Sequence, residues 1–245
     1  MTPPEPTLSL VVACYNEGPR LADNVATIRR TLDATCWDYE LIFIDDASAD
    51  ETPQTLRRIV DGDPRAALHL HDRNVGRGGT VAEGLRLARG TVAGFIDVDL
   101  EVHARYIPSM VLAILEDGYD VATAHRIYKF RLTPGAVVRW VLSAGYRRLA
   151  RLALGSPFKD TETGYKFFRR EVLLPVLDRC EDRHWFWDTE VMLEACRAGL
   201  RVTEIPALFR RQREGSSLRV FGDTWYYVGA LRRYRRRAPA GERRG

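Results

Sequence analysis

Apolar and polar residues alternate along the first half of the chain in blocks that predict strands and helices in turn. Short apolar runs that end in polar residues are typical of buried strands, and they lie at 8–16, 40–46, 66–71, 91–97 and 119–126. Apolar residues at helical spacing lie between them, at 21–32, 51–60, 78–90 and 107–118. This succession predicts an α/β fold with a doubly wound, mostly parallel sheet covered by helices on both faces.

The second half of the chain has a less regular pattern. Residues 160–177 begin with turn-forming residues and continue into a short apolar segment and a helix. A further helix is expected within 185–199, with Asp188 and Glu190 at its start, where carboxylates favour the positive end of the helix dipole. Residues 201–217 predict a final strand followed by an Arg-rich loop.

Polar residues follow four of the predicted strands at the point where each strand ends. They read YNE at 15–17, DD at 45–46, HDRN at 71–74 and DVDLE at 97–101. In open sheets of this kind, ligands bind beyond the carboxyl ends of the strands. The four ends therefore predict one crevice, acidic near Asp97 and basic near Arg73 and Arg77, which suits a metal-bound phosphate ester. The alternative is that polar residues merely terminate the strands.

The acids of DVDLE stand at alternate positions, and their mutual repulsion works against folding unless a cation lies among them. Asp97 and Asp99 can ligate one hard divalent cation, Mg²⁺ or Mn²⁺, which prefers carboxylate and phosphate oxygens. Glu101 can join them directly or through water. A lone D-x-D is a weak signal, but its place at a strand end makes it more specific.

Composition narrows the class of protein. The chain has 245 residues, of which 45% are hydrophobic and 29% charged, so it can form one large globular domain. No apolar run approaches the roughly 18 residues of a membrane span, and no leader-like segment precedes the first strand, which predicts a cytoplasmic protein. The four cysteines lack paired metal-ligand spacing and are expected to be reduced.

Basic residues gather in two places. Residues 121–159 hold eight Lys or Arg and no acid, and within them 135–155 predicts an amphipathic basic helix. Such a helix either lies in a lipid interface or packs on the sheet with a solvated Arg face. Residues 232–245 hold seven Arg and one Glu, and this tail is expected to be disordered. It is either a solubilising tail or a segment attracted to acidic lipid or nucleic acid.

Seven segments together resemble the inverting family-two glycosyltransferases of GT-A fold, and among them the dolichyl-phosphate or polyprenyl-phosphate mannose and glucose synthases. The resemblance covers about 8–218, and the order and spacing of its segments are far more specific than any one motif. The segments are VVACYNE (11–17), ELIFIDDASADET (40–52), RNVGRGGTVAEGLRLARG (73–90), DVDLE (97–101), DTETGYKFF (160–168), WDTE (187–190) and EIPALFRRQREGSS (204–217).

The resemblance implies a division of the chain. Residues 1–220 would form a GT-A domain, with a nucleotide-sugar-binding half at 7–126 and an acceptor half at 127–220 that contains helix 135–155. Residues 221–245 would form a partly disordered basic tail.

The resemblance also implies roles for individual residues. Asp97 and Asp99 would bind the metal and diphosphate, with Glu101 as a further ligand. Residues expected to bind the nucleotide or substrate are Ala13, Tyr15, Glu17, Asp45, Asp46, Arg77, Asp97 and Ser217. Residues expected to act in catalysis are Asp99, Asp188, Arg126 and Arg213, the two arginines by clamping phosphate oxygens.

The implied activity is metal-dependent transfer of a hexose from a nucleotide sugar, of GDP-mannose or UDP-glucose type, to a polyprenyl or dolichyl phosphate. The alternative is transfer to a soluble hydroxyl acceptor, a natural product or a glycan, which requires a base. Asp188 is then the best base, unless it only caps the helix at 189–198. A minor alternative from another class is a basic nucleic-acid-binding protein with a degenerate transferase domain, and nucleic acid is not the expected partner.

The sequence departs from the family at two points. Many relatives have Lys after the Ser of the R-x-G-x-S loop, whereas Leu218 and Arg219 follow Ser217 here, so the phosphate clamp is expected to differ. Many bacterial members also carry C-terminal membrane spans, but WYYVGAL at 225–231 is too short. Contact with a lipid acceptor would then depend on surface attachment to the cytoplasmic membrane face, through helix 135–155 and the Arg-rich tail.

Overall fold

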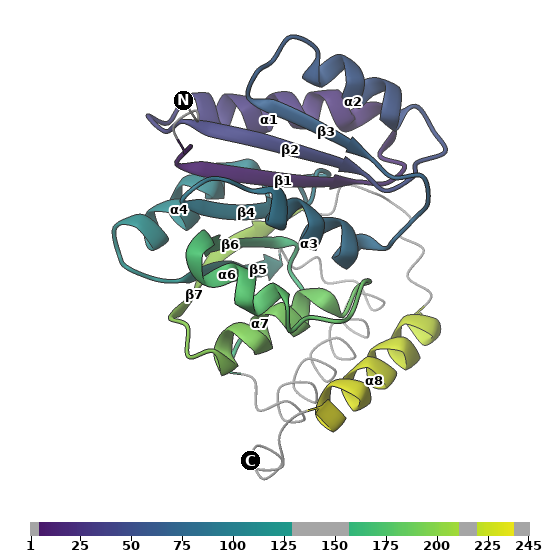
Figure 1. Cartoon of the computed structure of the whole chain (residues 1–245), viewed down its shortest axis with the longest axis vertical. Coiled ribbons are helices and arrows are strands. Elements are labelled where there is room, and N and C mark those ends of the chain that lie inside the picture. The colour runs from purple at the N-terminus through teal and green to yellow at the C-terminus, as the bar shows by residue number, and fades with distance from the viewer. Residues whose placement is uncertain (1–4, 129–156, 211–219, 238–245) are drawn as a thin grey trace.

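The computed structural model describes residues 5–128, 157–210 and 220–237, and its centre is one seven-stranded sheet (Figure 1). The strand order is β3-β2-β1-β4-β6-β5-β7. The strands are β1 (Leu8–Cys14), β2 (Tyr39–Asp45), β3 (Ala66–Leu70), β4 (Val92–Ile96), β5 (Val121–Tyr128), β6 (Tyr165–Arg169) and β7 (Val202–Phe209). Of the pairings between two named strands in the described ranges, only those of β6 are antiparallel, so the prediction of a mostly parallel α/β sheet is confirmed.

Helices cover both faces of the sheet because apolar side chains of the central strands point alternately to either side. The α-helices are α1 (Leu21–Asp33), α2 (Thr52–Val60), α3 (Arg77–Leu87), α4 (Ile107–Leu115), α6 (Arg170–Leu177), α7 (Trp187–Arg197) and α8 (Val220–Arg237), with short 3₁₀ turns at Gly18–Arg20 and Ala104–Tyr106. One core packs α1, α2 and α4 against β1, and the other packs α3, α6 and α7 against the opposite face.

Strand register brings the polar segments of the sequence to one edge of the sheet. Cys14 at the end of β1 pairs with Asp45 at the end of β2, and Val11 pairs with Phe95 near the end of β4. Because β6 runs the other way, it begins at this edge, where Tyr165 pairs with Ile96. The segments after β1, β2 and β4 therefore meet the segment before β6, as the strand-end pattern predicts.

The two predicted halves of the chain share this sheet. β6, from the second half, lies between β4 and β5 and hydrogen-bonds to both. Residues from 160 onward consequently reach the same edge as the DVDLE segment, and the site is built from both halves.

The sequence predicts a partly disordered tail at 221–245, with disorder at 232–245, but residues 232–237 are helical in the structure. These residues belong to α8, which lies beside α7 at the lower right of Figure 1 and buries Ala230 and Tyr234 against Phe186 and Leu193 of the rest of the domain. Apolar residues spaced along the helix, including Tyr234 within the arginine run, form a face that packs on the domain and that the charge count alone hides. Residues 238–245 and the predicted helix at 135–155 lie outside the described residues.

None of the described helices combines the length and the apolar character that crossing a bilayer demands.

Candidate functional site

A chain of four alternating charges crosses the edge of the sheet where β4 ends. Arg77, the first residue of α3, donates from Nη2 and Nε to Asp97 Oδ1, at 2.6 Å and 3.2 Å. Its Nη1 donates to Asp188 Oδ2 on α7. The other oxygen of Asp188, Oδ1, accepts a hydrogen bond from Lys166 Nζ at 3.1 Å. Asp97 and Asp188, predicted as metal ligand and base, are thus joined through one guanidinium.

Arg77 is held in place by aromatic rings as well as by carboxylates. Its guanidinium carbon lies 5.8 Å from the centre of the Phe95 ring and 5.7 Å from that of Trp185, distances at which cation–π attraction operates. Burial alone would lower the pKa of Arg77, but Asp188 and Asp97 outweigh it and raise that pKa. Arg77 therefore stays a cation throughout the pH range in which the protein is folded.

Lys166 lies on β6 with a completely buried side chain, and it is a site residue that the sequence reasoning missed. Its Nζ also donates to the backbone carbonyl of Thr163. Burial lowers the pKa of Lys166, and the negative charge of Asp188 offsets only part of that effect. One feature of the sequence could have identified Lys166 as a site residue: it is a single Lys between Tyr165 and Phe167 in the apolar run that forms β6. A charge buried in such a run needs a partner of opposite charge.

Gly164 lets the second half of the chain approach Asp97 closely. Its carbonyl oxygen accepts a hydrogen bond from the Asp97 amide at 3.0 Å. A Cβ added to Gly164 would overlap both Asp97 Oδ2 and Arg77 Nη2. The glycine is therefore required by the close approach and not by its backbone angle.

The DVDLE segment forms a tight turn beyond β4. Leu100 adopts a left-handed conformation with φ of 55°, and its amide donates to the Asp97 carbonyl at 3.2 Å. Asp99 Oδ1 accepts from the Glu101 amide at 3.1 Å. This turn places Asp97 with about half of its side chain exposed (48%), next to the crevice.

The described part of the chain contains no group of three or more His, Cys, Asp or Glu side chains that converges as a metal site, so Asp97, Asp99 and Glu101 are not assembled into one three-carboxylate cage. Hard oxygen donors are nevertheless in place, since Asp97 and Glu101 line the same pocket. Mg²⁺ typically takes one or two protein carboxylates and completes its shell with phosphate oxygens and water. The donor set fits such a cation, with a bound diphosphate supplying the remaining ligands.

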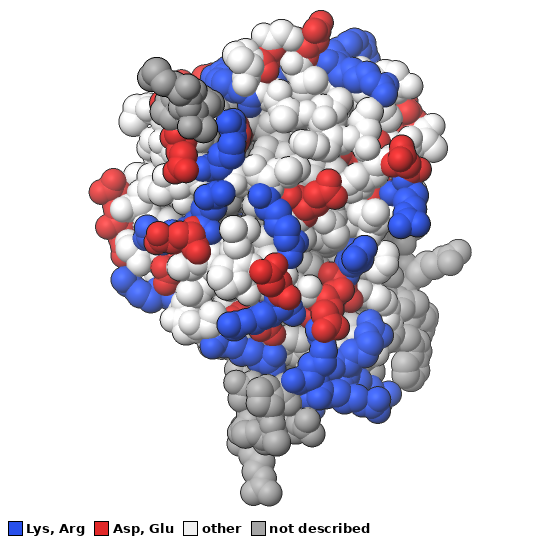
Figure 2. Space-filling view, in the orientation of Figure 1, with Lys and Arg blue, Asp and Glu red and all other residues white. Residues whose placement is uncertain are grey.

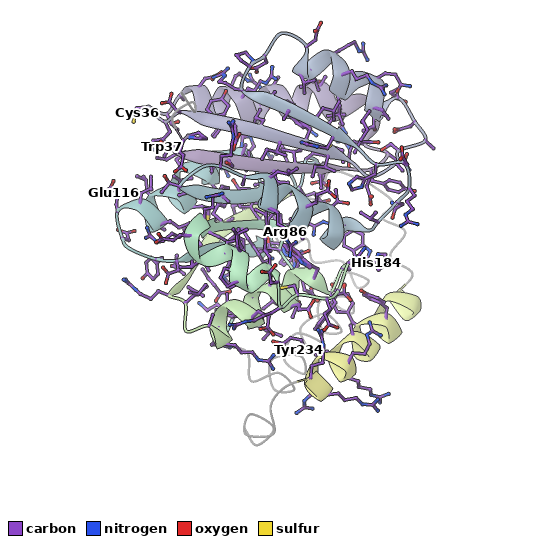
Figure 3. All side chains as sticks on the ribbon, viewed as in Figure 1. Cys36, Trp37, Arg86, Glu116, His184 and Tyr234 are labelled. Carbon is purple, nitrogen blue, oxygen red and sulfur yellow. The ribbon has the colours of Figure 1, made fainter. Side chains whose placement is uncertain are left out.

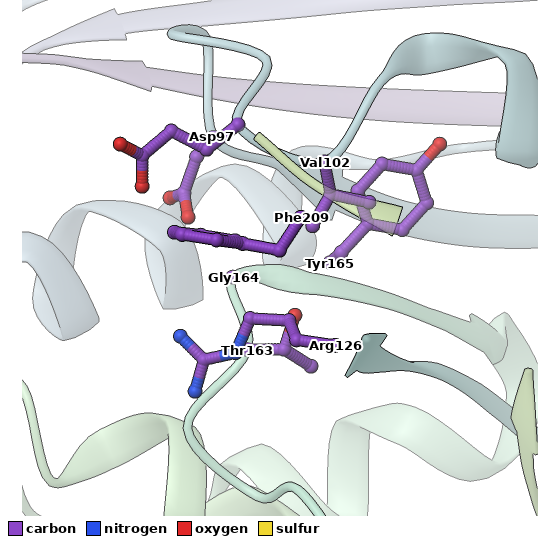
Figure 4. Close-up of a pocket in the computed structure, with 8 residues that line it drawn as sticks. Asp97, Val102, Arg126, Thr163, Gly164, Tyr165 and Phe209 are labelled. Carbon is purple, nitrogen blue, oxygen red and sulfur yellow. The ribbon is translucent and has the colours of Figure 1, made fainter. Parts of the chain in front are cut away.

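Arg126 also lines this pocket, but its guanidinium is already engaged. It lies within β5, not at the end of the strand as predicted, and binds Asp160 through Nε at 2.7 Å and Nη2 at 2.9 Å. Burial would raise the pKa of Asp160, but the charge of Arg126 outweighs it and lowers that pKa. Figure 4 shows the Phe209 ring between Asp97 and Arg126 in this pocket. Arg126 thus anchors the 160–164 segment, and its phosphate-clamping role stays a prediction.

The residues predicted for the nucleoside lie after β1 and β2. Tyr15 is half exposed (50%), and Glu17 accepts from the Tyr15 amide at 3.4 Å. Asp45 is buried and accepts from Ser48 Oγ at 2.5 Å, and Ser48 in turn accepts from the Asn16 amide at 2.9 Å. This network ties the segment after β1 to the segment after β2. Ala13 lies on β1 just before it and is partly buried.

Asp46 holds the loop that leads to Arg77 in place through hydrogen bonds. It accepts hydrogen bonds from the amides of Val75 and Gly76, at 2.8 Å and 3.0 Å, and binds His71 Nδ1 at 2.9 Å. Burial would lower the pKa of His71, but Asp46 and Glu83 outweigh it and raise that pKa. Asp46 therefore fixes the start of α3, and its contact with a nucleotide stays a prediction.

The structure contradicts the alternative in which Asp188 only caps a helix. The N-cap position of α7 is Phe186, and Asp188 lies in the first turn with both oxygens bound to the side chains of Arg77 and Lys166. Arg213 and Ser217, the other predicted phosphate ligands, lie outside the described residues.

Comparisons with known proteins point to one family. A family model described as Glycosyl transferase family 2 matches residues 9–176, more than half of the chain. Glycosyltransferase AglD of Haloferax volcanii is 35% identical over 201 residues, which are 81% of this chain and 32% of that protein. Dolichyl-phosphate beta-glucosyltransferase ALG5A of Trichomonas vaginalis is 26% identical over 88% of this chain and 69% of its own length. The chain thus spans about a third of the archaeal relative.

Among solved structures, the chain is similar to glucosyl-3-phosphoglycerate synthase from Mycobacterium tuberculosis. In its complex with Mn²⁺, UDP and glucosyl-3-phosphoglycerate, the TM-score is 0.68 at 20% identity, covering 92% of this chain and 78% of that one. Another structure of that enzyme holds Mg²⁺ and UDP. At this identity the likeness shows the fold, which is GT-A.

Proposed function

Because the chain belongs to glycosyltransferase family 2, we propose that it is an inverting enzyme that moves glucose from UDP-glucose to a polyprenyl or dolichyl phosphate. Family membership supports the transfer, and the relatives named dolichyl-phosphate beta-glucosyltransferases support this donor sugar and acceptor over a mannosyl donor. The TM-score of 0.68 to an enzyme solved with UDP supports uracil as the base.

One observation carries the proposal: Arg77 binds Asp97 and Asp188 at once. Asp97 follows β4 at the edge where the nucleotide-binding segments end, and Asp188 comes from the second half of the chain. A sugar bound beside this bridge would have its diphosphate near Asp97 and its acceptor near Asp188, as inversion by in-line attack requires.

Asp97 and Asp99, with Glu101, would hold Mg²⁺ or Mn²⁺, and the cation would supply positive charge that stabilises the departing diphosphate. The protein's own side chains would supply the rest of the positive charge and would orient the groups that bind the diphosphate. Arg77 fixes the direction of the Asp97 carboxylate, and Gly164 leaves the space that this carboxylate needs. Arg126 holds the 160–164 segment against the same pocket.

The acceptor decides whether a base is needed. A lipid phosphate is substantially ionised at neutral pH because its second pKa is near 6, so it can attack without losing a proton to the protein. A hydroxyl acceptor is the second candidate, and the position of Asp188 favours it. Each Asp188 oxygen accepts from one cation and keeps a further lone pair that can take the proton of a hydroxyl.

For a lipid acceptor the enzyme must approach a membrane surface, and α8 offers basic side chains for this purpose. Figure 2 shows Lys and Arg gathered at the lower end of the visible face, in the region of α8, whereas both signs are mixed over the rest of that face. Attachment to an anionic surface by such residues is electrostatic and weakens with salt. The predicted contribution of 135–155 belongs to the same proposal.

The test is a transfer assay that crosses two donors, UDP-glucose and GDP-mannose, with a short-chain prenyl phosphate and a panel of simple glycosides, in Mn²⁺ and Mg²⁺. The proposal expects glucosyl prenyl phosphate as the product. Absence of transfer and of donor hydrolysis from folded protein would refute it.

Asp188→Asn then separates the acceptors. It should lower transfer to the phosphate by no more than the loosening of Arg77 does, about 30-fold, and should abolish transfer to a hydroxyl.

A further inference from the structure

Helix α8 packs on the loop that carries Trp185 to the site. We define the Trp185 loop as residues 180–186, between α6 and α7. Phe186 lies at its end, buried against Tyr227 and Tyr234 of α8 with ring centroids 6.1 Å apart in each pair. This aromatic cluster is the apolar part of the contact between the C-terminal helix and the domain.

Two tyrosine hydroxyls of α8 bind the Trp185 loop directly. Tyr226 donates to the carboxylate of Asp182, with 2.6 Å to each oxygen. Tyr227 donates to the backbone carbonyl of Trp185 at 3.1 Å. These bonds fix the loop at both of these points.

The last turn of α8 adds a charged contact at the start of the same loop. Arg237 binds Glu181 at 2.7 Å and the buried Glu190 of α7 at 2.6 Å. Glu190 also accepts from the backbone amides of Glu181 and Asp182, at 3.0 Å and 2.7 Å. The buried carboxylate of Glu190 on α7 therefore binds α8 and the loop at the same time. The hydrogen bonds of such a network strengthen one another.

The Trp185 loop in turn contacts the start of α3. The carbonyl of Arg183 accepts from the Gly79 amide at 3.0 Å, and Trp185 lies over the guanidinium of Arg77. Gly76 and Gly78 pass so close to His184 and Trp187 that neither has room for a side chain. Any shift of the loop must therefore move the residue that joins Asp97 to Asp188.

We propose that α8 is a positioning element of the transfer site, which holds the Trp185 loop through Tyr226, Tyr227 and Arg237 and thereby fixes Arg77 between Asp97 and Asp188. This role rests on the proposed function. The opposite side of α8 carries Arg232, Arg235 and Arg236, which are exposed and lie at helical spacing away from the tyrosines. The helix thus presents one face to the loop and another to the surroundings.

The test compares two sets of hydroxyl deletions. The double variant Tyr226→Phe Tyr227→Phe keeps both rings and removes only the bonds to the loop. Its matched control is Tyr234→Phe, which also removes a tyrosine hydroxyl from α8. That hydroxyl donates to Glu194 at 2.8 Å, and Glu194 lies in the second half of α7, away from the loop. Figure 3 labels Tyr234 on the side of α8 that faces α7.

Hydrogen exchange gives the readout that does not depend on activity. The double variant should speed amide exchange about tenfold at 181–183 and at 76–80, because local opening follows the lost contacts. Tyr234→Phe should leave both segments unchanged. Faster exchange confined to α8 in the double variant would overturn the proposal, as would equal effects of the two variants on the loop.

Kinetics give the second readout. The double variant should lower kcat for glucose transfer about tenfold through misplacement of Arg77, whereas Tyr234→Phe should leave kcat unchanged. An unchanged kcat in a variant with a loosened loop would also overturn the proposal. If the unaltered protein transfers no sugar at all, the proposed function fails, and exchange at 76–80 alone still decides whether α8 holds the start of α3.

Discussion

Lys166 and Asp188 form an ion pair in the interior of the protein, with 3.1 Å between Lys166 Nζ and Asp188 Oδ1 and only 3% of the Asp188 side chain exposed. Arg77 binds the other oxygen of the same carboxylate. Asp188 is thus held from two sides and keeps one orientation, which costs desolvation of two cations and one anion. A carboxylate fixed in this way is suited to receive a substrate that must arrive in one geometry.

Replacement of Lys166 by Met should destabilise the protein. Asp188 would lose the bond to Oδ1 while remaining buried, and removal of one partner of a buried pair typically costs roughly 3 kcal/mol. The measurement is the free energy of unfolding from urea denaturation at pH 7. Lys159→Met, at an exposed position seven residues earlier, should change it by less than about 0.5 kcal/mol. Equal stability of Lys166→Met and the unaltered protein would show that the pair contributes nothing.

Arg77→Lys should impair transfer while keeping the charge. An ammonium group is a point charge and cannot reach Asp97 and Asp188 together as the planar guanidinium does. The expected loss in kcat/KM for glucose transfer is about 30-fold, or about 2 kcal/mol of transition-state stabilisation. The control is Arg86→Lys on the same helix, because Arg86 pairs with Asp178 at 3.1 Å on the surface, where such pairs are worth little. Similar kinetics of the two variants would contradict a bridging role.

Gly164→Ala should disturb the site without any change of charge. The added methyl group overlaps Asp97 Oδ2 and Arg77 Nη2, so the Asp97 carboxylate must turn. We expect affinity for UDP with Mn²⁺ to fall at least about tenfold, which is about 1.4 kcal/mol, measured by calorimetry.

The control for Gly164→Ala is Gly79→Ala within α3. The nearest atom to a Cβ there is 3.5 Å away, which is ordinary contact. Helix propensity should then raise stability by up to about 1 kcal/mol, with binding unchanged. Normal UDP binding by Gly164→Ala would refute the close-approach argument.

The sequence predicts the sheet well because its central strands are buried on both faces and so form short apolar runs. Acids lie at the end of β2 and just after β1 and β4, at the carboxyl edge of these parallel strands, where ligands bind in open sheets of this kind. The antiparallel β6 is harder to place. Nothing in its five residues shows that it inserts between β4 and β5, since strand order depends on long-range pairing.

Side-chain partners are less predictable than positions. Asp188 and Arg77 are 111 residues apart in the sequence, and their contact depends on the packing of α3 against α7. Lys166 was overlooked because a Lys in an apolar run is usually exposed, whereas here the whole side chain is buried beside Asp188. Helix α8 was not predicted because arginines dominate its last turns, while the apolar residues that pack on the domain are spread along the helix.

The His71 contact should make stability depend on pH in a defined direction. Burial would lower its pKa, but Asp46 and Glu83 raise it above the usual value of about 6.5. A raised pKa in the folded state means that the contribution is complete below about pH 6.5 and is lost as pH rises through the folded pKa. The difference in unfolding free energy between the unaltered protein and His71→Gln should therefore be larger at pH 6 than at pH 8.5.

Urea denaturation at the two pH values measures this difference. The same His71→Gln comparison in a Glu83→Gln background should show a smaller pH dependence, because one of the two acids that favour protonated His71 is gone. A difference that grows as pH rises would have the wrong sign and would refute the assignment.

Metal dependence should distinguish the acids of DVDLE from one another. Since three carboxylates do not converge among the described residues, the cation is expected to rely on the D-x-D pair, Asp97 and Asp99, and on the diphosphate itself, with Glu101, which lines the pocket beside Asp97, contributing through water. Asp99→Asn should weaken Mn²⁺-dependent UDP binding about a hundredfold, about 2.7 kcal/mol, and EDTA should have the same effect on the unaltered protein. Glu101→Gln keeps an oxygen donor at its position, so binding should fall by less than about threefold. If Glu101→Gln were as damaging as Asp99→Asn, the charge of Glu101 would be essential and the two-carboxylate arrangement would be wrong.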